Sequence, residues 1–600
     1  MVVLFSSVAF LAVTLSVDPD AVKAELPRTL YGTGLEDVNH EIYGGLDAQR
    51  LYGESFEEEF PCAFRWWKKI EETGGGEFGH PNDVAHWGKR SLLLDPRGGT
   101  CAIANFGLHA CGVPTRADRR SVGHLFVRGK TDRLEVGLQD FFGERTYATA
   151  RLDADTPDDW KRVDFTLTPD MTDPHGRFFV RASGEGKVWI DDVYLADEPT
   201  DEFGRLGCRE DIVAALRVEG VNFLRWGGTM VNVPGYRLAN MNGTGERKPY
   251  KGHWYEYSSG GFGPYEFVRF AAAMKLPCAL SISRDETLED ALAFADWTRR
   301  FDIPICVQIG NEECITQFGE DNIESYRRYF ANVRRLVPPM RERNPKLTFA
   351  SALMWEVQVG TLRMDLNEEA FRALDGLVDF WDLHLWMPKL DGAFSSLKIM
   401  RDVRDFLKRM NPRTRMKVVI FEENGKTHSL ERALAHAVTM AGVRELGPDI
   451  YTCCGANALQ ANLRNDNNWN QGQVFFTTDQ VWLQPYGYAK QMGARNHREL
   501  LVGGSSDDPE VVLSPTRARD GSSVVLHVVN VSGEPKPFTL KGLDGYRLAK
   551  ATELSGAKLG LDNPVTDRTA VVPRDVTARL AEEKTLAPYS YSVLEFVRCD

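Results

Sequence analysis

At 600 residues the chain is too long for a single hydrophobic core, so two to four domains are expected. Hydrophobic residues make up 43% of the chain and charged residues 26%, proportions that are ordinary for a globular protein. The formal net charge of −13 argues against nucleic acid and against an anionic membrane surface as partners.

The first segment in chain order is apolar from Val2 to Val17. This run is too short for a membrane span and is typical of the core of a secretory signal, although no Lys or Arg precedes it. Val22-Lys23-Ala24 offers a small-residue cleavage site. The sequence therefore predicts a signal peptide over residues 1–24 and a secreted or periplasmic protein.

The next two segments have different patterns. Residues 25–54 contain RTLYGTGLE (28–36), a strand candidate that belongs with the strands found after residue 198. Residues 55–197 consist of short alternating runs, such as RLEVGLQDF and KVWIDDVYLAD, separated by Gly, Pro and Asp turns. That pattern predicts an inserted antiparallel β-sandwich.

Residues 198–492 alternate between apolar strands and amphipathic helices, which is the pattern of a parallel sheet covered by helices. With the strand at 28–36 the candidates number eight, which favours an α/β fold of the (β/α)8 TIM-barrel type over a doubly wound sheet. Residues 493–600 contain SSVVLHVVNVS and YSYSVLEFVRC and predict a C-terminal β-sandwich. The seven strand candidates of the barrel segment lie at 221–228, 278–284, 305–312, 347–354, 379–386, 417–423 and 449–459.

Polar side chains follow the predicted barrel strands at their carboxyl ends, where the active site of a TIM barrel lies. Glu312 ends the fourth strand and Glu423 the seventh. Two carboxylates facing each other across the barrel mouth suit glycoside hydrolysis, because one protonates the leaving oxygen while the other attacks or activates water. The other polar residues at these ends are Glu36, Arg225, Asn311, His384, Trp386 and Asn457.

Each of the two acids has an acidic neighbour, Glu313 beside Glu312 and Glu422 beside Glu423. Adjacent side chains on a strand point to opposite faces. If Glu312 and Glu423 face the barrel mouth, Glu313 and Glu422 point away from it. No metal-ligand cluster and no phosphate-binding loop accompanies these residues, so no metal and no cofactor is expected.

Several stretches of the chain are similar to one enzyme family. They resemble glycoside hydrolase family 51, typified by α-L-arabinofuranosidases, and in particular its plant-type branch. The resemblance covers roughly residues 27–490. The stretches that carry it are LYGTGLEDVNHEIYGGLDAQ (30–49), KVWIDDVYLAD (187–197), REDIVAALRVEGVNFLRWGG (209–228), VQIGNEEC (307–314), DLHLW (382–386), VVIFEEN (418–424) and the segment 465–492.

The resemblance implies a retaining mechanism. It places the proton donor at Glu312 beside Asn311, and the nucleophile at the second acid of VVIFEEN, Glu423. The family's sugar-contacting acid falls on Glu36 and its strand-two arginine on Arg225.

The strand-six signature of the family falls on His384 and Trp386, with Trp386 where the family has Tyr. Trp254, in GHWYEY, is expected either to form an aromatic wall of the sugar site or to serve in packing. The chain also departs from the family pattern: Thr229 stands in a segment without the usual proline, and Asn424 follows the assigned nucleophile in place of Tyr or Trp.

The sequence therefore predicts an exo-acting α-L-arabinofuranosidase that acts on plant-type polysaccharide or oligosaccharide. An alternative is the same chemistry on another linkage, as in a β-xylosidase, an endo-β-glucanase or a galactofuranosidase. A second alternative, of another class, is an inactive carbohydrate-binding protein whose inserted sandwich carries the binding through exposed aromatics. The candidate aromatics are Trp66, Trp67, Trp87, Phe141 and Phe142.

Overall fold

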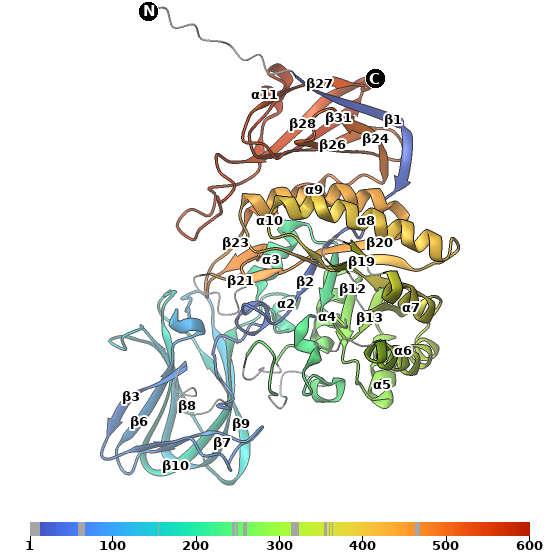
Figure 1. Ribbon diagram of the computed structural model, residues 1–600. Coiled ribbons are helices and arrows are strands. Elements are labelled where there is room, and N and C mark those ends of the chain that lie inside the picture. Colours follow the sequence, from blue (N-terminus) through green and yellow to red (C-terminus); the bar gives the residue numbers. More distant parts are fainter. Residues whose placement is uncertain are drawn as a thin grey trace, which may run out of the picture.

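The computed structural model shows a central barrel flanked by two β-rich domains (Figure 1). Residues 1–11 of the predicted signal and residues 353–354 of the fifth predicted strand lie outside the described residues. The described residues are 12–57, 66–153, 155–242, 247, 250–255, 261–313, 323–352, 357–358, 361–362, 364–462 and 469–599.

The central domain is a closed parallel barrel, as the sequence predicts. Its strands are paired in a ring, because β17 pairs with β14 on one side and with β19 on the other. β17 and β18 together occupy one position in the ring, so the ring has eight positions. The strands are β2 (Tyr31–Leu35), β11 (Phe223–Trp226), β12 (Cys278–Ile282), β13 (Ile305–Ile309), β14 (Thr348–Ser351), β17 (Phe380–Asp382), β18 (Leu385–Trp386), β19 (Lys417–Asn424) and β20 (Ile450–Gly455).

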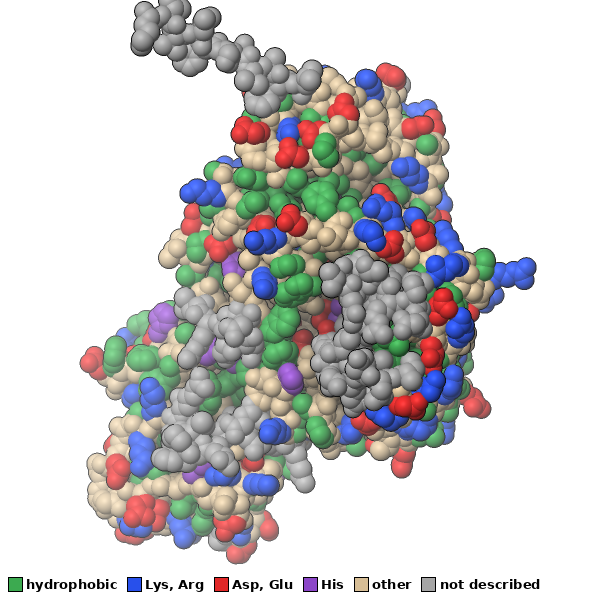
Figure 2. Space-filling model, in the orientation of Figure 1, with side chains coloured by type: hydrophobic (Ala, Val, Ile, Leu, Met, Phe, Trp, Pro, Cys, Tyr) green, Lys and Arg blue, Asp and Glu red, His purple; other side chains and the backbone are tan. Residues whose placement is uncertain are grey.

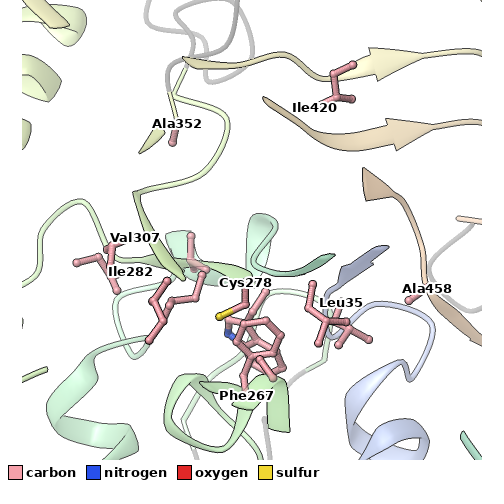
Figure 3. Close-up of a cluster of buried hydrophobic side chains, with 14 of the residues drawn as sticks. Leu35, Phe267, Cys278, Ile282, Val307, Ala352, Ile420 and Ala458 are labelled. Carbon is pink, nitrogen blue, oxygen red and sulfur yellow. The ribbon is translucent and has the colours of Figure 1, made fainter. Parts of the chain in front are cut away.

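Alternation along these strands separates two apolar layers. Phe223, Ala279, Cys306, Phe380 and Phe421 belong to a cluster inside the barrel. The side chains one position away face the helices and form the largest core of the molecule, part of which Figure 3 shows, including Ile420 and Val307. A strand of this barrel is buried on both faces, which explains its continuous apolar sequence.

Helices cover the outside of the barrel (Figure 1). Local signals in the sequence fix some of their ends: Thr287 caps α5 through Asp290 N, and Glu266 bonds the backbone N–H that precedes α4. The helices are α3 (Glu210–Glu219), α4 (Pro264–Met274), α5 (Leu288–Thr298), α6 (Ile323–Arg343), α7 (Met364–Leu374), α8 (Leu390–Met410), α9 (Leu430–Leu446) and α10 (Pro485–Arg495).

Short elements accompany the barrel strands and helices. They are the π-helical turn η1 (Ile42–Leu46), α2 (Glu202–Arg205), the turns η3 (Thr229–Asn232), η4 (Leu238–Met241) and η5 (Gly447–Asp449), and the short strands β15 (Val357–Gln358), β16 (Thr361–Leu362), β21 (Leu459–Ala461), β22 (Val474–Phe476) and β23 (Val481–Leu483).

The inserted domain lies between β2 and β11 in the sequence and is antiparallel throughout, as predicted. Its two long strands, β7 and β10, pair along most of their length and surround a separate hydrophobic core. Trp67 is fully buried in that core. The strands are β3 (Trp67–Thr73), β4 (Glu77–Gly79), β5 (Leu92–Asp95), β6 (Thr100–Asn105), β7 (Ser121–Gln139), β8 (Thr146–Leu152), β9 (Asp155–Leu167) and β10 (Arg177–Asp197), with the turn η2 (Leu108–Ala110).

The C-terminal domain contains a strand that the sequence assigned elsewhere. β1 (Val13–Glu25) pairs antiparallel with β24 and parallel with β27, and buries Val13, Leu15 and Val17 in the domain's core. The predicted signal peptide over residues 1–24 is therefore wrong for residues 13–24, because cleavage after Ala24 would remove a strand from inside the sheet. The alternating apolar side chains of this segment pack into the core of the C-terminal domain.

The remaining elements of the C-terminal domain follow the barrel directly. They are β24 (Leu500–Ser506), β25 (Val511–Arg517), β26 (Ser523–Asn530), β27 (Lys536–Lys541), β28 (Tyr546–Ser555), β29 (Arg574–Asp575), α11 (Thr577–Glu582), β30 (Thr585–Leu586) and β31 (Ser590–Arg598).

The surface carries charges of both signs. On the face that Figure 2 shows, Lys and Arg side chains are interspersed with Asp and Glu side chains over the barrel. Such mixing does not provide the continuous basic surface that nucleic acid requires. Among the described helices, none combines the length and the apolar character needed to span a membrane.

Candidate active site

Two carboxylates meet at the carboxyl ends of the barrel strands, and they are Glu312 and Glu422. Glu312 follows β13 and has a left-handed backbone conformation, with φ of 51°. One oxygen of Glu312, one oxygen of Glu422 and a ring nitrogen of His384 all lie within 4.8 Å of one another. This close approach suits a retaining glycosidase, in which the carboxyls are about 5–5.5 Å apart, and does not suit an inverting one.

The sequence-based choice of Glu423 over Glu422 is wrong. Glu423 is fully buried on the outer side of β19, where Arg432 Nη1 lies 3.0 Å from one carboxylate oxygen and His436 Nδ1 lies 2.7 Å from the other. Both partners belong to α9, so the carboxylate points into the layer between barrel and helix and away from the mouth.

A β-bulge explains the reversal. Phe421 faces the barrel interior and Ile420 faces the helices, so plain alternation would send Glu423 inward. Between Ile420 and Glu423, however, β19 advances three residues while β20 advances only two, from Cys453 to Gly455. The extra residue shifts the alternation and turns Glu422 into the mouth, as bulges beside active sites often do.

Burial alone would raise the pKa of Glu423, but His436 and Arg432 outweigh it and lower the pKa to about 2. Burial lowers the pKa of His436 despite its acidic neighbour. The imidazole is therefore neutral near pH 7 and donates a hydrogen bond, while Arg432 supplies the positive charge. Glu423 is an ionised structural anchor, not a group that substrate reaches.

A polar layer lies above the apolar floor of the barrel. Arg225 Nη1 donates to Glu422 Oε1 at 2.8 Å and Arg225 Nη2 donates to Asn311 Oδ1 at 2.5 Å. Gln308 accepts from Ser281 at 2.7 Å and donates to Asp382 at 2.7 Å. Arg225 therefore orients the carboxylate of Glu422.

His384, which follows β17, connects the two carboxylates. Its Nδ1 lies 2.9 Å from Glu312 Oε1 and 3.5 Å from Glu422 Oε2, and its Nε2 lies 2.9 Å from Asp382 Oδ2. Burial alone would lower the pKa of His384, but the charges of Glu422 and Asp382 outweigh it and raise the pKa well above its ordinary value. The ring is therefore charged at neutral pH and donates from both nitrogens.

Glu36 and Trp254 lie together beside the mouth. Trp254 Nε1 donates to Glu36 Oε1 at 2.7 Å. Burial, followed by the charge of Glu422, raises the pKa of Glu36 to about 8. Glu36 is thus protonated near neutral pH and can donate a hydrogen bond to a sugar hydroxyl.

Trp386 lies at the rim, with 47% of its surface exposed. Its ring meets that of Trp469 edge to face at 5.7 Å, and Trp469 in turn meets Trp254 at 6.4 Å. Trp469 lies in the segment 465–492 that carried part of the resemblance, but its place beside Trp386 follows from the fold and not from any spacing in the sequence.

Asn457 is connected to Glu422 through other amides. Gln471 Nε2 donates to Asn457 Oδ1 at 3.1 Å and to Asn424 Oδ1 at 2.8 Å, and Asn424 Nδ2 donates to Glu422 Oε2 at 3.1 Å. Sequence reasoning missed Gln471, which lies 47 residues after Asn424 and has no strand-end signal of its own.

Glu313 points away from the mouth, as predicted, and pairs with Arg284. Burial, offset in part by Arg284, raises the pKa of Glu313 to about 7. With Glu422 facing the mouth, the residue after the nucleophile position is Glu423, so the departure from the family pattern at that place is Glu423 and not Asn424.

The known proteins with similar sequences include several that are named as α-L-arabinofuranosidases. No protein-family model matches the chain. The chain is 23% identical to Alpha-L-arabinofuranosidase 1 of Arabidopsis thaliana over 98% of its own length and 91% of that protein. It is 27% identical to an extracellular exo-α-L-arabinofuranosidase of Streptomyces chartreusis over 44% of this chain and 34% of the relative.

Solved structures share the fold. An arabinose-bound α-L-arabinofuranosidase of glycoside hydrolase family 51 superposes with a TM-score of 0.78 at 18% identity, covering 98% of this chain and all of the other. A family 51 enzyme from Bifidobacterium longum gives a TM-score of 0.61 at 14% identity, covering 98% and 99%. The architecture expected from the resemblance is therefore confirmed.

Proposed function

We propose that this chain, whose resemblance to glycoside hydrolase family 51 is confirmed by its relatives and its fold, is a retaining exo-acting α-L-arabinofuranosidase. The observation that carries the proposal is the close approach of Glu312 and Glu422 in the barrel mouth. Plant-type polysaccharides and oligosaccharides with arabinofuranosyl branches are the proposed substrates. The relatives that match over the chain are named as α-L-arabinofuranosidases, which supports this sugar.

In the first step Glu422 attacks the anomeric carbon and forms an ester, while Glu312 protonates the departing oxygen. Arg225 orients Glu422 through Oε1 and Asn424 through Oε2. These two donors fix the carboxylate in the orientation that the attack requires.

In the second step Glu312 removes a proton from the water that cleaves the ester. The negative charge of Glu422 favours a protonated Glu312 before the attack, and this repulsion disappears once Glu422 is esterified. His384 Nδ1 lies 2.9 Å from Glu312 Oε1 and orients this carboxyl.

Asn311 and Glu36 are proposed to bind the sugar hydroxyls. Asn311 is fully buried, its Oδ1 is taken by Arg225, and its Nδ2 has no hydrogen-bond partner among the described residues. A substrate hydroxyl would satisfy this donor, and such contacts strengthen as charge develops at the anomeric centre.

The test is hydrolysis of aryl glycosides by the wild type and by Glu422→Ala, with and without azide. We expect release from the α-L-arabinofuranoside, and a loss of more than about 1,000-fold in Glu422→Ala, equivalent to about 4 kcal/mol of transition-state stabilisation. Azide should restore turnover in that variant by taking the place of the missing carboxylate, giving a glycosyl azide of inverted configuration.

The matched control is Glu423→Gln, which changes the adjacent acid. Azide rescue of Glu423→Gln in place of Glu422→Ala would overturn the assignment. The panel also contains β-D-xyloside, β-D-galactofuranoside and β-D-cellobioside. Cleavage of one of these alone would keep the mechanism and assign the specificity to another linkage. Other linkages are tested because the chain departs from the family pattern at Thr229 and Trp386.

An extracellular location is proposed on the name of the Streptomyces relative. In that case any processing has to leave β1 in place, and cleavage must fall before Val13.

A further inference from the structure

A cavity of about 660 Å³ lies between the inserted domain and the barrel. Trp87, Phe126 and Tyr194 line it from the inserted domain, and Asp47, Arg205 and Phe262 line it from the barrel side. None of its lining residues belongs to the Glu312–Glu422 site. The space is partly open to solvent and is not filled by side chains of the described residues of either domain.

Trp87, Phe126, His124 and Tyr194 line one side of the cavity. Together with His86, which contacts Trp87 and Phe126 but does not itself line the cavity, they form a run of rings here called the aromatic wall. His86 meets Trp87 edge to face at 4.8 Å and stacks on Phe126 at 3.6 Å. His124 meets Phe126 edge to face at 6.1 Å and stacks on Tyr194 at 5.3 Å. Burial lowers the pKa of His124 to about 4, so its ring is neutral.

Apart from the aromatic wall, the lining is polar and carries charges of both signs. Four acids and four arginines line the cavity, among them Asp47, Glu266 and Arg269. Asp47 is 6% exposed and accepts a hydrogen bond from Gln49 N at 3.0 Å. Burial, followed by the charges of Asp37 and Glu266, raises the pKa of Asp47 to about 7.

We infer that this cavity binds a short neutral saccharide, at a site separate from the proposed catalytic mouth. Aromatic rings offer flat apolar surfaces to the C–H faces of sugar rings, and the facing carboxyl, amide and guanidinium groups bond hydroxyls. The volume falls in the range of small-ligand sites, which occur preferentially at domain interfaces. Acids and arginines in equal number give the lining no strong charge of one sign, which favours a neutral polyol over a phosphorylated or carboxylated ligand.

The test is affinity electrophoresis of the full chain in gels that contain soluble arabinoxylan, arabinan or mixed-linkage β-glucan. Glu422→Gln is used throughout, so that the gel polysaccharide is not cleaved. We expect retardation in at least one gel. Trp87→Ala should weaken it at least tenfold in apparent Kd, because it removes one end of the aromatic wall.

A second variant guards against a fold defect in the first. Arg205→Trp places a bulky ring into the cavity from an exposed position at the end of α2 and leaves the aromatic wall intact. Melting temperature and near-ultraviolet circular dichroism check that both variants are folded. The matched control is Phe142→Ala, which removes the most exposed aromatic of the inserted domain, at 78% exposure, and should not change retardation.

The inference would be overturned if adding Trp87→Ala or Arg205→Trp to Glu422→Gln left the retardation unchanged. All binding would then be assigned to the barrel mouth. Loss of retardation in Phe142→Ala instead would move the site to the exposed loop and also overturn it. Absence of retardation in all three gels would have the same consequence. None of these results bears on the proposed hydrolysis, which is measured separately on aryl glycosides.

Discussion

The two adjacent acids on β19 lie on opposite sides of the strand. Glu422 lies in the barrel mouth with Arg225, and Glu423 lies behind the strand with Arg432 and His436. Four hydrogen-bonding or ionic contacts from α9 and the neighbouring strand, including one from Cys453, fix Glu423 and with it the backbone that carries Glu422. The buried acid thus holds the strand in the conformation that presents Glu422, the proposed nucleophile, to the barrel mouth.

Replacing Glu423 with Gln should destabilise the fold. The change leaves Arg432 buried without its counter-charge, and breaking such a pair costs about 3–5 kcal/mol. The measurement is the free energy of unfolding at pH 7 by chemical denaturation. Glu313→Gln is the control, since the partner of Glu313 is half exposed and the expected change is about 1 kcal/mol or less.

The same pair gives a pH dependence of stability. The pKa of Glu423 is lowered to about 2 in the folded chain, below its value of 4.5 in the unfolded chain. Its stabilisation is therefore fully present above pH 4.5 and is lost as the pH falls from 4.5 towards 2. In Glu423→Gln this acid-dependent component of the free energy of unfolding should disappear. If the free energies of unfolding of the wild type and the variant changed in parallel between pH 4.5 and pH 2, the lowered pKa of Glu423 would be refuted.

Glu36 predicts an alkaline limit of activity. Because its pKa is raised to about 8, it is protonated in the free enzyme near pH 7 and ionises above pH 8. The new charge would repel Glu422 and would end donation to the sugar. We expect kcat/KM to fall above pH 8 in the wild type, and the alkaline limb to shift upward or vanish in Glu36→Gln, which is measured with an aryl arabinofuranoside.

At the level of the elements, most of the barrel could be predicted from the sequence. Its strands are buried on both faces and read as continuous β-branched and aromatic runs, and Arg225, Asn311, Glu312 and His384 lie at the expected ends. The bulge in β19 could not be predicted, because FEEN contains neither the Gly nor the Pro that usually marks one. A single inserted residue was enough to exchange Glu422 and Glu423.

The strand β1 also could not be predicted, because its local sequence does not distinguish a strand from a signal peptide. An apolar run at the start of a chain has the same composition whether it is a signal or a strand, and its partners β24 and β27 lie about 500 residues later. The alternation of Val13, Leu15 and Val17 is the only local signal of a strand.

Truncation distinguishes the two interpretations of this segment. A chain that begins at Leu26 lacks β1 and exposes the edges of β24 and β27, so we expect aggregation or a melting temperature lowered by at least about 5 °C. A chain that begins at Ala12 keeps β1 and should melt like the full chain. Equal melting of both would mean that β1 contributes nothing to the folded domain.

At the level of the whole molecule, the chain leaves the barrel after η1 and returns at α2. An antiparallel bridge between Asp47 and Cys208 brings the two crossing points together. This junction allows a whole domain to be inserted between barrel strands without disturbing them. It also borders the cavity, so the same crossing places the aromatic wall against the barrel.

The central claim, that hydrolysis proceeds through an ester on Glu422, is tested most directly by trapping. An activated 2-deoxy-2-fluoro-α-L-arabinofuranoside slows both steps and allows the glycosyl-enzyme to accumulate. Digestion and tandem mass spectrometry of the labelled chain then locate the ester. The label should lie on Glu422, and its appearance on Glu423 or on no carboxylate of β19 would contradict the account.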